Sequence, residues 1–328
     1  MTINTYKKIC QYFHLVQNVH IQGWGEPMLH PELRDMIQLA KNAGCRVSLT
    51  TNGVLLTQKY SEEIIKDGLD SITISIAGAT QRTHGRIRRG SHLGKIIENI
   101  HTVSNLKEQT GSKTPKLILS FLMTKSNIKE LPEVVHLAKG LGIHDIVAAN
   151  LDYTQTKAQD DLKVFSCNRA DSEFKKYIEV ADKLAETMKI SFHSYPLETE
   201  EVAVCEMDPL RIVFFSHDGG ISPCVYLNLP KDGEIPRIFC GKHYSVKQMC
   251  FGNIKGQDFM EVWNSTAYRR FRSLYQNRLY IMQRFYSDAV FGMSSPYALD
   301  EAENALKRQM KEHPLPQGCH VCYKAYNI

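Results

Sequence analysis

Nine cysteines are the residues of this 328-residue sequence whose type and placement point most directly to chemistry. Cys10, Cys45 and Cys167 are scattered through the first two thirds of the chain. The other six gather in the C-terminal part: Cys205, Cys224, Cys240, Cys250, Cys319 and Cys322. In a cytosolic chain thiols stay reduced, so an uneven distribution indicates metal or redox chemistry more than disulfides.

Four of these cysteines have spacings that suit thiolate ligation. Cys205 is followed by thirteen residues, Gly219, four residues and Cys224, and the chain ends with the close pair Cys319-x2-Cys322. Zinc and iron–sulfur clusters both prefer such soft sulfur ligands, and the spacing alone does not choose between them. We therefore predict these four as the ligands of one metal centre.

Two alternatives stay open for the thiols. Cys240 and Cys250 lie in a loop with His243, and one of these side chains could replace one of the four ligands. The plainer alternative is that the C-terminal thiols are scattered buried cysteines without a common ligand.

Three polar motifs follow strand-like runs in the first half of the chain. They are QGWGEP at 22–27, TTNG at 50–53 and SIAG at 75–78, the last followed by Arg82, Arg86, Arg88 and Arg89. Taken alone, the first motif is explained as well by a simple turn as by a binding site, the second is explained better by a turn, and the third is explained better by a solvated basic loop. Because all three end successive strands, they fall on the face where barrel enzymes build their sites.

The elements that must position these motifs alternate in type. Strand-like runs start near residues 18, 45, 70, 116, 143 and 189, and helical stripes separate them. Such alternation predicts a parallel sheet wrapped by helices up to about residue 196.

A helical stripe of Ile3, Tyr6, Cys10 and Phe13 precedes the first strand. A parallel sheet that starts this way leaves Val19 and Ile21 on a strand with one unpaired edge, which folded proteins usually cover. The expectation is that about one strand and its loop precede Met1 in the coding sequence.

After residue 196 turn residues dominate, so a second domain is expected over 197–328, after a first over 1–196. It contains a basic aromatic segment that reads as an RNA-binding surface or as a helix packed on a core. We favour packing, with Trp263, Phe271, Leu274 and Tyr275 facing that core.

The motifs together resemble the radical S-adenosylmethionine (SAM) superfamily, through GWGEP, the Asn52-Gly53 turn and SIAGATQRTHGRIRRG at 75–90. The resemblance implies a partial (β/α)6 barrel, here lacking its first strand. It also implies that Gly25, Glu26 and Pro27 hold the methionyl amino group, that Ser75 and Arg88 lie near the ribose and carboxylate, and that Asn52 shapes the floor.

The Cys-x13-Gly-x4-Cys element, the run FGNIKGQDFMEVWNSTAYRRFR and the closing Cys-x2-Cys resemble SPASM or related twitch domains. This resemblance implies a small irregular α+β domain with one auxiliary 4Fe-4S cluster on Cys205, Cys224, Cys319 and Cys322, and it favours iron over zinc. The Cys-x3-Cys-x2-Cys loop of the family's radical cluster does not occur in the sequence. A radical cluster is therefore expected only if an upstream segment supplies that loop.

The resemblance predicts an enzyme that cleaves SAM and abstracts hydrogen from a peptide or protein, reduced by a flavodoxin or ferredoxin. No catalytic residue is assigned. A non-catalytic iron–sulfur protein that binds peptides or transfers electrons, and a zinc-stabilised RNA-binding module, are the alternatives. A net charge of +5 is too weak over this length to argue by itself for a nucleic-acid partner. The absence of a long apolar run argues for a cytoplasmic protein without a membrane partner.

Overall fold

Two compact units make up the chain in the computed structural model, which describes residues 1–291 and 297–328. The first unit comprises Met1–Leu151 and Ala158–Glu198, and the second comprises Asp152–Lys157 and Thr199–Ile328. Residues 152–157, which the sequence analysis places in the first domain, are thus grouped with the second unit.

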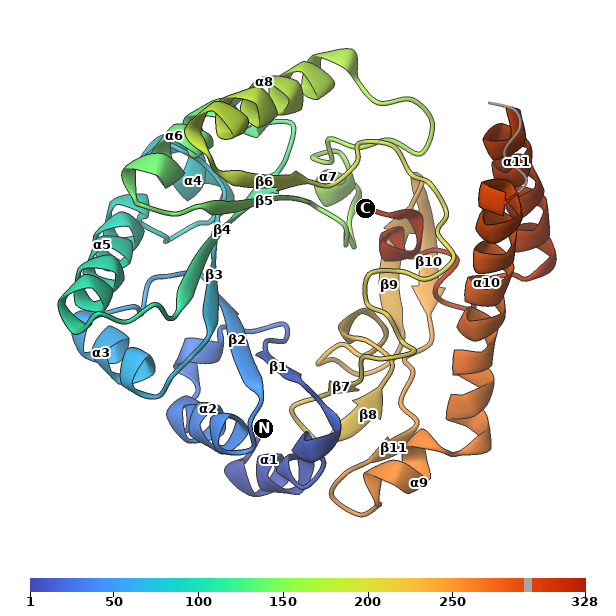
Figure 1. Ribbon diagram of the computed structural model, residues 1–328, viewed down its shortest axis with the longest axis horizontal. Helices are drawn as coiled ribbons and strands as arrows, with labels where there is room; N and C mark the ends of the chain where they lie inside the picture. Colours follow the sequence, from blue (N-terminus) through green and yellow to red (C-terminus); the bar gives the residue numbers. More distant parts are fainter. Residues whose placement is uncertain (292–296) are drawn as a thin grey trace. The chain divides into compact units, whose positions relative to one another are not determined.

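The first unit is built on one parallel sheet of six strands in chain order, with helices over its outer face (Figure 1). The strands are β1 (Asn18–Ile21), β2 (Arg46–Thr51), β3 (Ser71–Ile76), β4 (Lys116–Met123), β5 (Asp145–Asn150) and β6 (Ser191–Ser194). All six coincide with the predicted runs, so the α/β barrel-like fold is confirmed.

One helix precedes β1, and the others connect successive strands, as expected where parallel strands need crossover connections. They are α1 (Ile3–Cys10), α2 (Leu33–Asn42), α3 (Gln58–Lys66), α4 (Gln81–Ile87), α5 (Leu93–Thr110), α6 (Leu131–Gly140), α7 (Lys157–Asp160) and α8 (Ser172–Met188). Their apolar stripes cover the sheet, and Ile37, Ile96 and Val134 are fully buried there.

The two faces of the sheet differ in polarity. In β3, Ile72, Ile74 and Ile76 are buried, while the alternate residues Thr73 and Ser75 are only partly covered. Successive side chains of a strand point to opposite faces, so the helix-covered face is apolar and the other is polar. In the register of the sheet, Thr73 lies beside Thr50 of β2 and Ser75 lies beside Ser120 of β4, so polar side chains of this face continue into both neighbouring strands.

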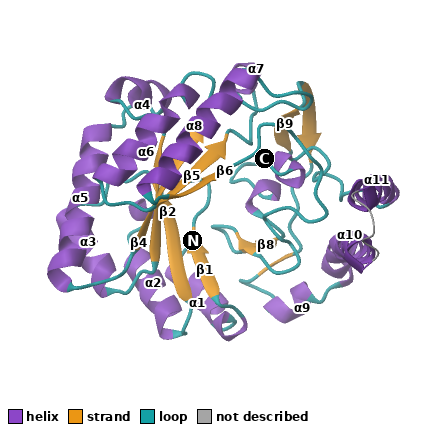
Figure 2. Ribbon diagram, turned by 45° about the horizontal axis from the view of Figure 1, so that its top comes forward, coloured by secondary structure: helices purple, strands orange, loops and turns teal. Residues whose placement is uncertain are grey.

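In its described residues, the second unit combines two small antiparallel sheets with three helices (Figure 2). One sheet contains β7 (Phe214–Phe215), β8 (Gly220–Ser222) and β11 (Gly252–Asn253), and the other contains β9 (Ile235–Phe239) and β10 (Lys242–Val246). The helices are α9 (Phe259–Trp263), α10 (Thr266–Phe291) and α11 (Tyr297–Glu312). Among the described residues, no helix has the length and apolar character needed to cross a membrane.

Helix α10 buries one stripe of side chains. Tyr268, Phe271 and Tyr275 are at most 6% exposed, as the packing interpretation predicts for the latter two. Leu274 is 38% exposed, so its predicted place in the core is wrong. It lies beside the buried stripe, which continues with Arg278, a fully buried residue.

Candidate functional site

A β-hairpin explains the spacing from Gly219 to Cys224. Strands β7 and β8 pair through Phe215 and Ile221, and the turn between them ends at Gly219 with φ +89°. An L side chain rarely adopts that backbone conformation, so glycine suits the turn. Strand β8 then leads through Pro223 directly to Cys224.

Tight turns present the other cysteines. The Asp208 N–H donates to the carbonyl oxygen of Cys205 over 2.9 Å. The Cys322 N–H donates to the carbonyl oxygen of Cys319 over 3.0 Å, which brings the two residues of the closing pair onto one side of a turn.

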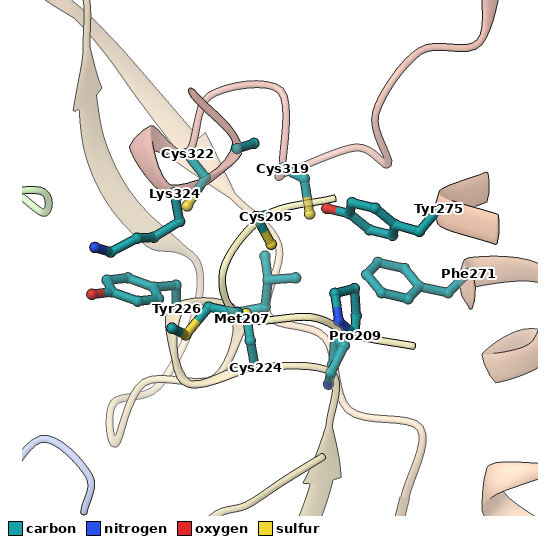
Figure 3. Close-up of a pocket in the computed structure, with 13 residues that line it drawn as sticks. Cys205, Met207, Pro209, Cys224, Tyr226, Phe271, Tyr275, Cys319, Cys322 and Lys324 are labelled. Carbon is teal, nitrogen blue, oxygen red and sulfur yellow. The ribbon is translucent and has the colours of Figure 1, made fainter. Parts of the chain in front are cut away.

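One pocket of the second unit is lined by all four predicted ligands, Cys205, Cys224, Cys319 and Cys322 (Figure 3). Tyr275 and Phe271 of α10 lie on one side of it, and Tyr226 and Lys324 on the other. Segments more than a hundred residues apart in the sequence therefore meet at one place, which is what a shared ligand requires.

The alternative cysteines do not line this pocket, and Cys240 is disulfide-bonded rather than a free thiol. Neither Cys240 nor Cys250 is among the described residues that line it. Cys250 is exposed, and its thiol donates to the carbonyl oxygen of Gly252 over 3.1 Å.

Burial raises the pKa of all four thiols, and repulsion from neighbouring cysteines adds to the rise for Cys205, Cys224 and Cys319. Burial raises the pKa of Cys205 to about 11 and that of Cys319 to about 12. The pKa of Cys224 is raised well above its usual value by burial and then by the charges of Cys319, Cys322 and Cys205. Four thiolates gathered in this way need a cationic centre to compensate them, and such a centre displaces their protons when it binds.

The donor set fits an iron–sulfur cluster in its chemistry, since it is all sulfur and largely shielded from water. Among the described residues, no group of three or more His, Cys, Asp and Glu side chains stands arranged to hold a metal ion. The assignment of the four cysteines as ligands therefore rests on their shared pocket and their chemistry, and it stays a prediction.

In the first unit, Glu26 joins two of the three motifs. Its Oε1 accepts hydrogen bonds from the Met28 N–H (3.2 Å) and the Thr51 hydroxyl (2.7 Å), and its Oε2 accepts from the Asn52 N–H (2.8 Å). The carboxylate thereby ties the loop after β1 to the end of β2. The Asn52 side chain accepts from the Val54 N–H at 2.9 Å and closes its own turn.

Gly25 borders open space. A Cβ built on this residue would meet no atom within 4 Å, so local packing does not require glycine there. Pro27 begins the short 3₁₀ helix Pro27–Leu29 that fixes the chain after this point. An open approach to the backbone beside a fixed turn is the arrangement that a close-contacting ligand needs.

Arg88 lies at the end of α4 with its side chain largely desolvated. Burial lowers the pKa of its guanidinium, and the nearby carboxylate of Glu26 acts in the opposite sense. Its Nε is buried and has no hydrogen-bond partner. A buried donor without a partner costs free energy, so an anionic ligand that accepts from it would relieve that cost. Ser75, on the polar face of β3, is also partly open.

The loop after β3 is held by groups that sequence reasoning missed. His84 is fully buried; its Nδ1 accepts from the Ala77 N–H (3.3 Å), and its Nε2 bonds to the Ser91 hydroxyl (2.9 Å). Glu130 accepts from the Ala79 N–H at 2.8 Å and from the Thr83 hydroxyl. The two residues of each of these hydrogen bonds are 7 to 51 positions apart in the sequence, so no local sequence pattern predicts them.

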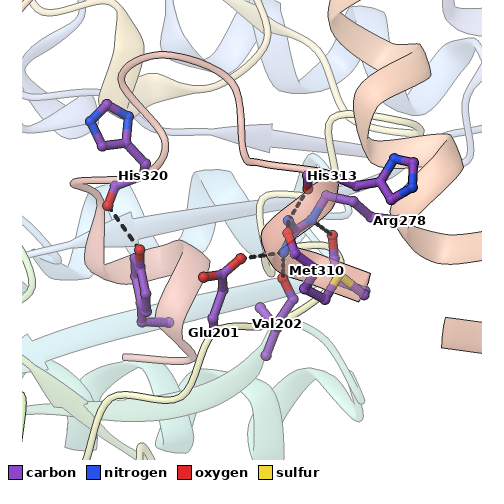
Figure 4. Close-up of polar contacts among 8 residues, drawn as sticks. Glu201, Val202, Arg278, Met310, His313 and His320 are labelled. Atoms are coloured by element: carbon purple, nitrogen blue, oxygen red, sulfur yellow. Dashed lines mark hydrogen bonds and ion pairs between the residues drawn. The ribbon is translucent and has the colours of Figure 1, made fainter. Parts of the chain in front are cut away.

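In the basic segment of α10, Arg272 and Arg278 pack against other groups, whereas Arg269 and Arg270 are exposed. Arg272 stacks on Trp263 at 3.8 Å from the ring centroid. Arg278 donates to carbonyl oxygens of Val202, Ala203 and His313 and pairs with Glu201 (Figure 4). Arg272 and Arg278 are therefore not available as an RNA-binding surface.

Both units match known protein families. Residues 1–138 match the profile described as Radical SAM superfamily, and residues 205–284 match the SPASM profile, described as an iron–sulfur cluster-binding domain. The chain is a radical SAM protein with a C-terminal SPASM domain. The SPASM match includes Cys205 and Cys224 and ends before Cys319 and Cys322.

Individual relatives of this radical SAM protein have modest identities. It is 27% identical over 270 residues, 82% of this chain and 73% of the relative, to the tungsten-containing aldehyde ferredoxin oxidoreductase cofactor-modifying protein of Pyrococcus furiosus. It is 30% identical to the PqqA peptide cyclase of Gluconobacter oxydans over 138 residues, 42% of this chain and 37% of the relative. By resemblance to such proteins it is an enzyme.

A solved structure gives the same fold. SuiB of Streptococcus suis, crystallised with SAM, superposes with a TM-score of 0.58 at 14% identity and covers 81% of this chain. At that identity the likeness concerns the fold alone. This radical SAM protein spans 58% of the length of SuiB and 37% of the length of the peptide cyclase.

Proposed function

We propose that this protein is a radical SAM enzyme that acts on a peptide or protein and uses one auxiliary 4Fe-4S cluster. The single observation that carries the proposal is the meeting of Cys205, Cys224, Cys319 and Cys322 at one buried pocket of a SPASM domain.

SAM is proposed to bind at the ends of β1, β2 and β3. The open backbone at Gly25 would receive its amino group, and Arg88 would donate to its carboxylate through the Nε that lacks a partner. The Glu26 carboxylate holds Asn52 in place as part of the floor. Ser75 would lie beside the ribose on the polar face of the sheet.

Reductive cleavage of one SAM molecule requires one electron from an external donor. A reductant of the flavodoxin or ferredoxin class would supply it through a radical 4Fe-4S cluster, which is expected only if a segment outside these 328 residues provides the Cys-x3-Cys-x2-Cys ligands. The bond between the sulfonium and the 5′-carbon would then break and give methionine and a 5′-deoxyadenosyl radical. The radical takes a hydrogen atom from the substrate and becomes 5′-deoxyadenosine. The auxiliary cluster would supply electron transfer or substrate contact when bound. The role of this chain's residues is to bind and orient.

The test is anaerobic reconstitution with iron and sulfide, followed by addition of SAM and dithionite. The proposal predicts 5′-deoxyadenosine, formed faster when peptides encoded beside the gene are added. Binding of SAM without any 5′-deoxyadenosine, in protein that carries its clusters, would contradict the enzymatic proposal.

A non-catalytic iron–sulfur protein is the second candidate, and one observation favours it. The 328 residues contain no Cys-x3-Cys-x2-Cys loop, so none of them is assigned as a ligand of a radical cluster. About four irons per chain and no 5′-deoxyadenosine would support this candidate, whereas about eight irons with product would support the enzyme. A colourless zinc protein with salt-sensitive RNA affinity would contradict both.

A further inference from the structure

Two buried cations lie beside the four-cysteine pocket. Arg237, on β9, is 3% exposed, and Lys324, two residues after Cys322, is 7% exposed. Both act on the thiols electrostatically. The positive charge of Arg237 opposes the rise in pKa that burial imposes on Cys319 and on Cys322, and Lys324 does the same for Cys322.

The charge of Lys324 is balanced. Its Nζ lies 2.7 Å from Oδ2 of Asp152 and 2.6 Å from Oε1 of Glu206. The same Asp152 oxygen accepts from the Tyr226 hydroxyl at 2.8 Å. Two carboxylates thus enclose one ammonium, and the group as a whole adds no net positive charge to the pocket.

The charge of Arg237 is not balanced. Its Nη1 donates to the carbonyl oxygen of Gly318 at 2.9 Å, and its Nη2 donates to that of Tyr226 at 2.7 Å. These neutral acceptors flank Cys319 and Cys224, so the guanidinium also joins the two segments that carry the ligands. Its Nε is buried without a hydrogen-bond partner, and among the described residues no carboxylate forms an ion pair with it.

We propose that Arg237 is a positioning residue that sets the reduction potential of the auxiliary cluster as well as holding its two ligand segments together. The inference rests on the proposed cluster at Cys205, Cys224, Cys319 and Cys322. Reduction adds one negative charge to the cluster, and an uncompensated cation in a medium of low dielectric constant stabilises the reduced form. Arg237 therefore raises the potential, and Asp152, whose charge also acts on Cys322, lowers it.

The experiment measures the midpoint potential of the auxiliary cluster by a redox titration monitored by EPR. Four reconstituted proteins are compared: wild type, Arg237→Gln, Arg237→Lys and Asp152→Asn. Arg237→Gln removes the positive charge. Arg237→Lys is the matched control, because it keeps the charge but loses the paired guanidinium hydrogen bonds to the carbonyl oxygens of Gly318 and Tyr226. Asp152→Asn keeps an oxygen that can accept from Tyr226 and leaves Lys324 with one carboxylate.

We expect Arg237→Gln to shift the reduction equilibrium at least tenfold toward the oxidised cluster. For a one-electron couple this shift lowers the midpoint potential by at least about 59 mV. Arg237→Lys should stay close to wild type, and Asp152→Asn should shift to higher potential. Clustered Arg237→Gln protein at the wild-type potential would overturn the inference. So would Arg237→Lys shifted as far as Arg237→Gln, because the paired hydrogen bonds and not the charge would then be responsible.

The outcomes separate this inference from the proposed function. If Arg237→Gln fails to assemble a cluster, Asp152→Asn decides, since an unchanged potential there contradicts charge control at this pocket. If wild-type protein takes up no iron–sulfur cluster at all, the proposed function fails first and the role of Arg237 fails with it.

Discussion

At the scale of single residues, the two sites share one physical feature. Each contains an arginine whose buried Nε lacks a partner: Arg88 in the first unit and Arg237 in the second. A protein gains no stability from such a donor, because desolvation without a hydrogen bond costs free energy. Groups of this kind mark places where function is retained at the expense of stability.

Replacing Arg88 by Met tests this directly. We expect SAM binding to weaken about 10- to 100-fold, the range that follows from losing a charge-assisted hydrogen bond. The free energy of unfolding should not fall, because no protein partner of the Nε is lost. Isothermal titration and denaturant unfolding measure the two effects. The matched control is Arg89→Met at the exposed neighbour, and equal weakening in that variant would remove Arg88 from the site.

His84 predicts a pH dependence of stability. Burial, with help from the charge of Arg88, lowers its pKa from 6.5 to about 4 in the folded state. The unfolded chain binds this proton below pH 6.5 and the folded chain does not, so stability present above pH 6.5 is lost as the pH falls toward 4. The loss amounts to about 3 kcal/mol.

Urea unfolding of wild type and His84→Gln between pH 7 and pH 4 measures this contribution. The variant should be the less stable protein at pH 7, and its deficit should shrink as the pH falls. A deficit that stays constant over the whole range would show that His84 contributes no proton linkage.

At the scale of elements, the closing turn decides whether Cys319 reaches the pocket. Gly318 has φ +98°, and a Cβ there would lie 2.8 Å from Cγ1 of Val246 and 3.3 Å from Cδ2 of Leu227. Strain and overlap act together, and the overlap involves side chains packed under the turn.

Gly318→Ala is therefore expected to lower the free energy of unfolding by about 1–3 kcal/mol and to reduce iron content after reconstitution. Gly233→Ala is the matched control, because φ there is +76° but no atom lies within 4 Å of the added Cβ. Full iron occupancy in Gly318→Ala would mean that the turn does not set the ligand position.

Elements were more predictable from the sequence than contacts between them. The six strands follow from β-branched runs separated by helical stripes, and the hairpin glycine and cysteine spacings are local patterns. The partners of Arg237 and Lys324 are not local: Asp152 lies in the loop after β5, 172 positions before Lys324. Leu274 shows the same limit within one helix, since its exposure depends on which face the rest of the unit covers.

At the scale of the whole molecule, Arg278 links the two stretches that carry ligands in the second unit. It bonds to Ala203 and Val202, just before Cys205, and to His313, six residues before Cys319.

Arg278→Met leaves several buried carbonyl oxygens without a donor, so the free energy of unfolding should fall by about 3 kcal/mol or more. Thermal unfolding measures the loss of stability, and Arg211→Met is the control because the Arg211 side chain is 84% exposed. An equal loss of stability in both variants would contradict the linking role of Arg278.

The measurement that tests the central claim most directly is the iron and sulfide content of anaerobically reconstituted protein, with its Mössbauer spectrum, for wild type and Cys224→Ala. We predict a four-iron cluster in wild type that is lost or converted to a three-iron form in Cys224→Ala. Wild-type protein that binds only zinc, or a cluster whose iron count and spectrum do not change in Cys224→Ala, would contradict the claim that these four thiolates share one iron–sulfur centre.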